Sequence, residues 1–325
     1  DAEARGATIL TRCAVKEAAR DGDTWLIETE KGTFRAKALV NAGGPWVADI
    51  LTGVMRQDSQ HNIRLVRGSH IVTERLYDHD KAYFFQGTDG RIIFAIPYEQ
   101  DFTLIGTTDA EHTDADTRPA ITDEERDYLC AFASEYFEKP VTPEDVVWTY
   151  SGVRPLYDDG ASSATAATRD YVLALDDNGP PVLSVFGGKI TTYRKLAEQA
   201  LAKMGLGEAW TAGVALPGGD FKVSQVRSLT QKLMADYPFL HQQWAGRLIR
   251  AYGTEAWEVL SGAKTAQDLG PDFGATLTGA ELKWMMTREY AARGEDALWR
   301  RTKLGLRLTF DQRAAVDTWM KEQAA

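Results

Sequence analysis

Residues 181–205, PVLSVFGGKITTYRKLAEQALAKMG, place a strand, a glycine turn and a helix in one short stretch. PVLSVF has no polar alternation, which is typical of a buried strand. Gly187 and Gly188 break that strand, and the residues after Lys189 favour a helix that Gly205 can end. Such a turn presents unpaired backbone N–H groups and the positive end of the helix dipole at a sheet edge. The stretch therefore predicts an α/β domain that binds an anionic or electron-rich ligand.

A second glycine turn follows an earlier strand-like segment. Residues 38–41 form a short, mostly apolar run that Ala42, Gly43, Gly44 and Pro45 break. Glycines allow a ligand to approach the backbone closely. A tight connection without any ligand explains a single Gly-Gly turn equally well.

The segment between the two glycine turns is rich in period-two and β-branched runs, which predict an antiparallel sheet. Asp89 and Gly90 separate two of these runs and indicate a hairpin. Thr122 and Glu125 form a capping-box pattern, which predicts a helix as far as Phe137. The runs are HIVTER (70–75), AYFFQ (82–86), RIIFAIPYE (91–99) and FTLIGTTD (102–109).

The pattern divides the chain into a glycine-turn domain (1–55), an antiparallel-sheet domain (56–147), a return to the glycine-turn domain (148–210) and a helical domain (211–325). The segment 148–210 begins within a predicted strand that enters a loop at SGVRPL. Four segments with helical character predict the last domain. They are VRSLTQKLMADY (226–237), WAGRLIRAYG (244–253), GAELKWMMTREYA (279–291) and TFDQRAAVDTWMKEQ (309–323).

Composition excludes several classes of protein. The chain is 44% hydrophobic and 26% charged, as expected of a folded globular protein. Its net charge of −10 argues against nucleic-acid binding. Cys13 and Cys130 form no metal-binding or disulfide pattern, and no apolar run approaches the length of a membrane span. We therefore expect no metal and no nucleic-acid partner.

Three cations and one histidine are candidates for chemistry. Arg154, Arg169 and Lys189 lie near the ends of predicted strands and could hold a phosphate ester. Each could equally be a solvated residue or an ion-pair partner. His70 lies in the strand-like run GSHIV, where a near-neutral pKa would let it accept a proton from an alcohol. The alternative is a strand histidine with a purely structural part.

Five motifs occur together and in order: RGSHIV (67–72), IGTTDAE (105–111), VVWTYSGVRPL (146–156), ATRDY (167–171) and LSVFGGKITTYRKLAE (183–198). With them, the chain resembles the aerobic, FAD-dependent glycerol-3-phosphate dehydrogenases along essentially its whole length. The resemblance implies a mixed α/β and α+β chain: part of an FAD-binding Rossmann-like domain, an antiparallel-sheet substrate (cap) domain and a C-terminal helical domain.

The resemblance implies oxidation of sn-glycerol 3-phosphate to dihydroxyacetone phosphate by hydride transfer to FAD, with electrons passed to membrane quinone. It also implies a cytoplasmic location, peripheral on the inner face of the cytoplasmic membrane. Members of the family begin with a dinucleotide fold that carries GxGxxG, a pattern absent from these 325 residues. We therefore expect a fragment of about the C-terminal two-thirds, which by itself lacks flavin and activity.

The same resemblance assigns the candidate site residues. His70 accepts the substrate proton or orients the hydroxyl, and Arg154 polarises the oxygen on the reacting carbon. Arg169 binds the substrate phosphate, and Lys189 contributes both there and at the flavin. The other cofactor-binding candidates are Val15, Ala42, Gly43, Trp46, Gly187, Gly188, Ile190 and Thr191. Trp46 could equally be a core residue.

Other functions remain open. Glycerol-3-phosphate oxidases and amino-acid-oxidase-like flavoenzymes share the glycine turns and the substrate sheet. An amino acid, however, does not require several cations for a phosphate dianion. A third alternative is a non-catalytic folded module, in which the helical domain mediates homo-oligomer or membrane-surface contact.

Overall fold

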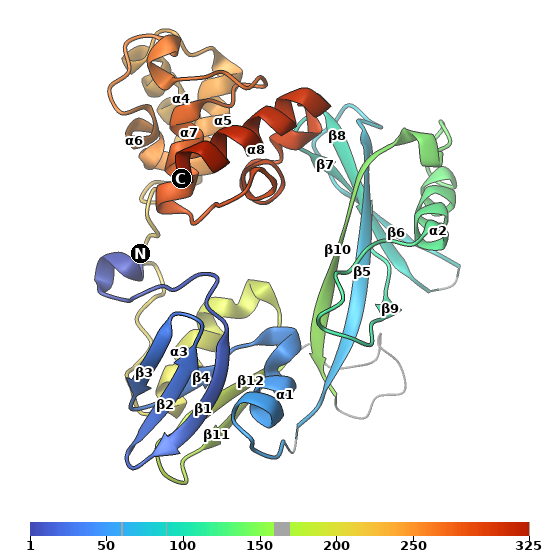
Figure 1. Cartoon of the computed structure of the whole chain (residues 1–325). Helices are drawn as coiled ribbons and strands as arrows, with labels where there is room; N and C mark the ends of the chain where they lie inside the picture. Colours follow the sequence, from blue (N-terminus) through green and yellow to red (C-terminus); the bar gives the residue numbers. More distant parts are fainter. Residues whose placement is uncertain (60, 89, 159–169, 325) are drawn as a thin grey trace. The chain divides into compact units, whose positions relative to one another are not determined.

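The computed structural model describes residues 1–59, 61–88, 90–158 and 170–324 (Figure 1). These residues form two compact units. One comprises residues 12–212, and the other comprises residues 1–11 together with 213–325. The predicted combination of an α/β part, an antiparallel sheet and a helical part is confirmed.

The α/β part of the first unit contains both glycine turns. Its sheet has the order β11 (Tyr171–Asp176), β12 (Val182–Gly187), β4 (Leu39–Asn41), and β12 pairs with β4 in parallel. Phe186 of β12 is 1% exposed and packs with residues from α1 (Val47–Asp49) and the turn that follows. The helix after the second glycine turn is α3 (Tyr193–Lys203), as the sequence predicts.

A three-stranded antiparallel meander, β1 (Val15–Asp21), β2 (Thr24–Thr29) and β3 (Gly32–Ala36), completes this part. Trp25 of β2 is 1% exposed and packs against Val182 of β12. Its indole Nε1 donates to the carbonyl oxygen of Pro180 at 3.0 Å. The meander is therefore fixed to the start of β12.

A larger antiparallel sheet has the order β10-β5-β8-β7-β6, and β9 also pairs with β5. Helix α2 covers one face (Figure 1), where Ile71, Ile93 and Ile105 are fully buried beneath it. Because side chains alternate along a strand, the neighbouring His70 belongs to the opposite face. The elements are β5 (Ile63–Glu74), β6 (Tyr83–Gln86), β7 (Ile92–Tyr98), β8 (Phe102–Gly106), β9 (Ala110–Glu111), β10 (Val146–Tyr157) and α2 (Asp123–Ser134).

Three details of this sheet bear on the sequence predictions. The loop predicted at SGVRPL is wrong, since β10 continues through these residues and pairs with β5 as far as Tyr157. The capping box of Thr122 and Glu125 is confirmed, although α2 ends at Ser134. The hairpin between β6 and β7 is confirmed by their antiparallel pairing, but Asp89 lies outside the described residues.

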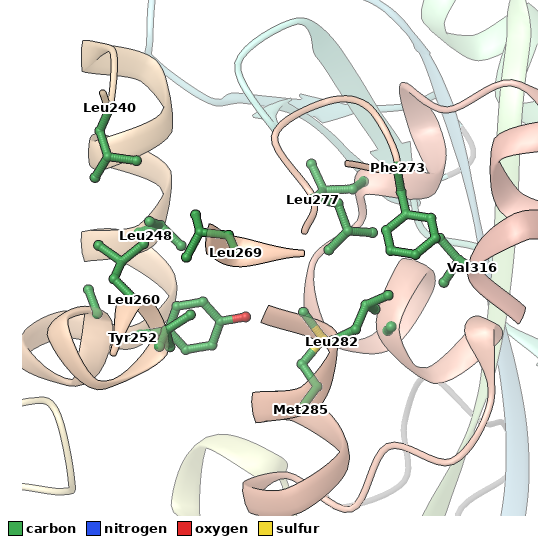
Figure 2. Packing of buried hydrophobic residues seen from close by; sticks show 14 of the residues in the cluster. Leu240, Leu248, Tyr252, Leu260, Leu269, Phe273, Leu277, Leu282, Met285 and Val316 are labelled. Atoms are coloured by element: carbon green, nitrogen blue, oxygen red, sulfur yellow. The ribbon is translucent and has the colours of Figure 1, made fainter. Parts of the chain in front are cut away.

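The helical unit forms around one hydrophobic core (Figure 2). Leu248 and Leu260 enter that core from α5 and α6, and Leu282 and Met285 enter it from α7. Among the described residues, no helix combines the length and apolar character needed to cross a bilayer. The main helices are α4 (Val226–Asp236), α5 (Gln242–Tyr252), α6 (Ala256–Leu260), α7 (Gly279–Arg288) and α8 (Phe310–Ala324).

One buried ion pair links α5 to α7 inside this unit. Glu281 is 1% exposed and accepts from both terminal nitrogens of Arg247 at 2.6 Å. Tyr252 also donates its hydroxyl to Glu281 at 2.8 Å. The pair is therefore satisfied by hydrogen bonds, which a buried carboxylate requires.

Candidate active site

The second glycine turn lies at the carboxyl end of β12. Gly187 and Gly188 have φ values of 74° and 95°, which glycine adopts without strain. A Cβ atom on Gly187 would lie 2.9 Å from the carbonyl oxygen of Asp170 and 3.0 Å from the backbone nitrogen of Tyr157. This glycine is therefore required by close backbone packing, whether or not a ligand binds.

The residues after this turn are accessible. Ile190 is 89% exposed, and both Lys189 and Thr191 are exposed. Residues Ile190–Thr192 form a 3-10 turn that continues into α3. Backbone N–H groups at such a helix start can bind negative charge.

The first glycine turn lies beside the second. Asn41 of β4 pairs with Ser184 of β12, so the two turns follow neighbouring parallel strands at the same sheet edge. The buried Asn41 side chain donates to the carbonyl oxygen of Val47 at 2.9 Å and accepts from the Gly43 N–H at 3.3 Å. A Cβ atom on Gly43 would lie 2.4 Å from the Ile50 side chain. The structure thus brings the two predicted turns together.

The three remaining cofactor-binding candidates lie in different surroundings. Ala42 is exposed, and Val15 lies at the start of β1 in the separate meander. Trp46 is 43% exposed, and its Nε1 donates to Asp116 at 2.7 Å, so the alternative of a core tryptophan is wrong. The flavin contacts of Val15, Ala42 and Trp46 stay predictions.

His70 is held between two cross-strand neighbours on β5. Its ring stacks on Tyr150 of β10, with centroids 4.8 Å apart and planes 7° apart. On the other side it lies over Gly106 of β8, where a Cβ atom would be 2.2 Å from the imidazole Cδ2. The absence of a side chain at Gly106 makes room for the imidazole.

Arg154 lies on the same face of the sheet. Its Nη2 donates to Thr107 Oγ1 at 3.1 Å, and its Nη1 pairs with Asp109. A Cβ atom on Gly68 would lie 2.5 Å from Nη2, so this glycine makes room for the guanidinium. Sequence reasoning missed Gly68, Gly106 and Tyr150, although a glycine inside a strand is a signal of close approach.

Burial is the main cause of an unusual pKa at His70. Burial and, to a smaller extent, the positive charge of Arg154 together lower the pKa of the imidazole from 6.5 to about 4. The near-neutral pKa expected from the sequence is therefore wrong: His70 is neutral near pH 7, but it is a weaker base than a free imidazole. Its Nδ1 is buried without a hydrogen-bond partner among the described residues.

This pKa predicts loss of stability in acid. The folded chain binds the His70 proton only near pH 4, whereas the unfolded chain binds it near pH 6.5. The contribution of His70 to the free energy of unfolding is thus complete above pH 6.5. It falls as the pH decreases toward 4, by up to about 3 kcal/mol. Urea unfolding of the wild type and His70→Asn across this range should diverge, with the wild type losing more. Parallel pH dependences would contradict the shifted pKa.

The predicted phosphate site is only partly described. Arg169 lies outside the described residues. Lys189 is exposed at the glycine turn, and Arg154 is paired on the sheet. Convergence of Arg154, Arg169 and Lys189 on one phosphate stays a prediction. Among the described residues, no group of His, Cys, Asp and Glu side chains could hold a metal ion.

Known proteins resemble this chain along almost its whole length. An aerobic glycerol-3-phosphate dehydrogenase of Escherichia coli is 43% identical over 98% of this chain and 66% of its own length. A D-erythritol 1-phosphate dehydrogenase of Brucella abortus is 41% identical over 97% of this chain and 65% of its own length. The chain thus spans somewhat less than two thirds of these relatives.

A solved structure has the same fold. The glycerol-3-phosphate dehydrogenase of Bacillus halodurans, complexed with FAD, superimposes with a TM-score of 0.79 at 27% identity, over 99% of this chain and 66% of that one. The family described as the C-terminal domain of alpha-glycerophosphate oxidase matches residues 209–323. The family described as FAD dependent oxidoreductase matches residues 1–194. The chain belongs to this family of FAD-dependent oxidoreductases.

Proposed function

We propose that this chain supplies the substrate sheet and part of the flavin site of an enzyme that oxidises sn-glycerol 3-phosphate to dihydroxyacetone phosphate. One observation carries the proposal: a neutral, partly buried imidazole and a guanidinium held by an ion pair share one face of the sheet. In the oxidation of an alcohol to a ketone by a hydride acceptor, a base can take the hydroxyl proton and a cation can stabilise the negative charge on the oxygen. The names of the curated relatives support a polyol phosphate as the substrate.

The residues present fit part of an FAD site. The two glycine turns lie at adjacent strand ends, and the exposed start of α3 offers N–H groups beside Lys189. These groups would favour negative charge on the pyrimidine edge of a flavin. When bound, FAD accepts the hydride from the substrate carbon. The pyrophosphate site belongs, on this proposal, to the third of the relatives that this chain does not span.

The side chains then have separate roles. His70 accepts the proton of the substrate hydroxyl on this proposal, because one nitrogen of its neutral ring carries no proton near pH 7. Arg154 stabilises the negative charge that develops on the same oxygen. Arg169 and Lys189 bind the phosphate on this proposal. Membrane quinone as the electron acceptor and peripheral attachment to the inner face of the cytoplasmic membrane rest on the motif resemblance alone.

Flavin reduction tests this function. The protein extended to the length of its relatives should retain a visible flavin band, and glycerol 3-phosphate should bleach it without oxygen. The isolated 325-residue chain, incubated with FAD and freed of unbound cofactor, should be colourless but folded by circular dichroism. Because a relative is named for D-erythritol 1-phosphate, that compound is the rival substrate. Bleaching by an amino acid but by neither phosphate would overturn the proposal.

Substitution of His70 tests its proposed role as the general base. His70→Ala should reduce the bleaching rate about 100-fold if His70 is the general base. His79→Ala is the matched control, because His79 follows the same strand β5 but is exposed and contacts Tyr83. Equal rates for the two variants would leave His70 a structural residue.

A further inference from the structure

Glu125 lies behind the sheet, on the face covered by α2 and opposite His70. Its side chain is 12% exposed and accepts from the Arg67 guanidinium at 2.8 Å. It also accepts from Thr108 Oγ1 at 2.7 Å and from Ser69 Oγ at 3.3 Å. One helix residue therefore binds both β5 and the segment that follows β8.

The link through Thr108 leads to Arg154. Thr108 Oγ1 accepts from the Ser69 N–H at 3.0 Å while it donates to Glu125, so its hydroxyl is held from two sides. The residues on either side of Thr108 are the two partners of Arg154: Thr107 accepts from Nη2, and Asp109 pairs with Nη1. The short segment 107–109 thus contacts Glu125 behind the sheet and Arg154 in front of it.

A second link runs through the strands. Ser69 Oγ lies 2.9 Å from Ser151 Oγ on β10, and the two residues are register partners. Ser151 precedes Arg154 by three residues on β10. Glu125 is therefore connected to the strand that carries Arg154 and also to the segment that contacts its guanidinium.

Helix capping alone does not explain this arrangement. Glu125 uses Oε2 for the capping box, accepting from the Thr122 N–H at 3.0 Å, while Oε1 accepts from Thr108 and Ser69. A second capping box in the chain offers a comparison. Its carboxylate, Asp145, is 31% exposed and pairs only with Thr142 and the surface residue Lys139 among the contacts described.

We propose that Glu125 is a positioning residue, which holds residues 107–109 in the geometry that orients the Arg154 guanidinium. Its effect on turnover rests on the proposed function of Arg154. Its effect on the Arg154 side chain does not, because that effect exists in the chain without any substrate.

The first experiment therefore measures Arg154 directly. The folded 325-residue chain is treated with phenylglyoxal, and modification of Arg154 is followed by peptide mass spectrometry. Glu125→Ala should speed this modification several-fold, because the partners of the guanidinium are no longer fixed. Glu125→Gln keeps an acceptor for Thr108 and should stay within about threefold of wild type. Asp145→Ala, which also loses a capping box, should match wild type.

Turnover in the extended holoenzyme is the second measurement. Glu125→Ala should lower kcat about tenfold or more with KM nearly unchanged, since small displacements of a group that acts in the transition state reduce kcat. Glu125→Gln should restore most of it. If Glu125→Ala does not fold, Thr108→Val removes the same link while the α2 cap stays intact, and it should give the same two effects.

The outcomes distinguish failure of the positioning role of Glu125 from failure of the proposed function. Unchanged Arg154 modification in a folded Glu125→Ala or Thr108→Val chain would overturn the positioning role and leave Glu125 a helix cap. A wild-type holoenzyme that oxidises no polyol phosphate would overturn the proposed function, whereas the modification rates would still decide the role of Glu125.

Discussion

Replacing Arg247 by methionine is expected to destabilise the helical unit by about 3 to 5 kcal/mol. The change leaves the carboxylate of Glu281, which is 1% exposed, without its bidentate partner. Only the Tyr252 hydroxyl would still donate to it among the contacts described. Urea unfolding at neutral pH measures the loss in free energy of unfolding.

The matched control is Arg250→Met, on the same helix α5 but at an exposed position. It should change stability by less than about 0.5 kcal/mol. Replacing Arg247 and Glu281 together by apolar residues of similar size should recover much of the loss, because no buried charge then remains. Equal losses in Arg247→Met and Arg250→Met would show that the ion pair contributes nothing.

Gly68→Ala is expected to lower kcat/KM of the extended enzyme about 100-fold, while the chain stays folded. The added Cβ would lie 2.5 Å from Arg154 Nη2 and 2.8 Å from Thr107 Oγ1. Because the nearest atom is the end of a flexible side chain, the guanidinium can move away and the sheet need not open. The variant therefore separates the position of Arg154 from the stability of the fold.

The control for this variant is Gly152→Ala. Gly152 is the register partner of Gly68 on β10, and its Cβ would meet nothing within 4 Å. It should keep kcat/KM within about twofold and should not lose stability, since alanine restricts the unfolded chain. Full activity in Gly68→Ala would show that the observed position of Arg154 is not needed for turnover.

Local signals in the sequence predicted much of this fold. The apolar run before Gly187, the capping box at Thr122 and the helical segments after residue 211 each specify an element through near neighbours. The loop predicted at SGVRPL was wrong because this segment contains Gly152 and Pro155, and glycine and proline normally interrupt strands. Here β10 is the edge strand of its sheet, and an edge position tolerates proline.

The candidate site was only partly predictable for a different reason. His70 and Arg154 could be selected by residue type and motif, but their surroundings depend on which strands become neighbours. Gly106 and Tyr150 contact His70 only because β8 and β10 pair with β5 on opposite sides. Periodicity along one strand carries no information about such partners.

The parallel pairing of β4 with β12 also fixes an order of events during synthesis. Asn41 pairs with Ser184, so the two glycine turns cannot become neighbours before the ribosome has made the whole segment between these two residues. The sheet that carries His70 and Arg154 is encoded entirely between them, and its last strand ends at Tyr157. The strands that carry His70 and Arg154 can therefore pair on a nascent chain before the second glycine turn has been made.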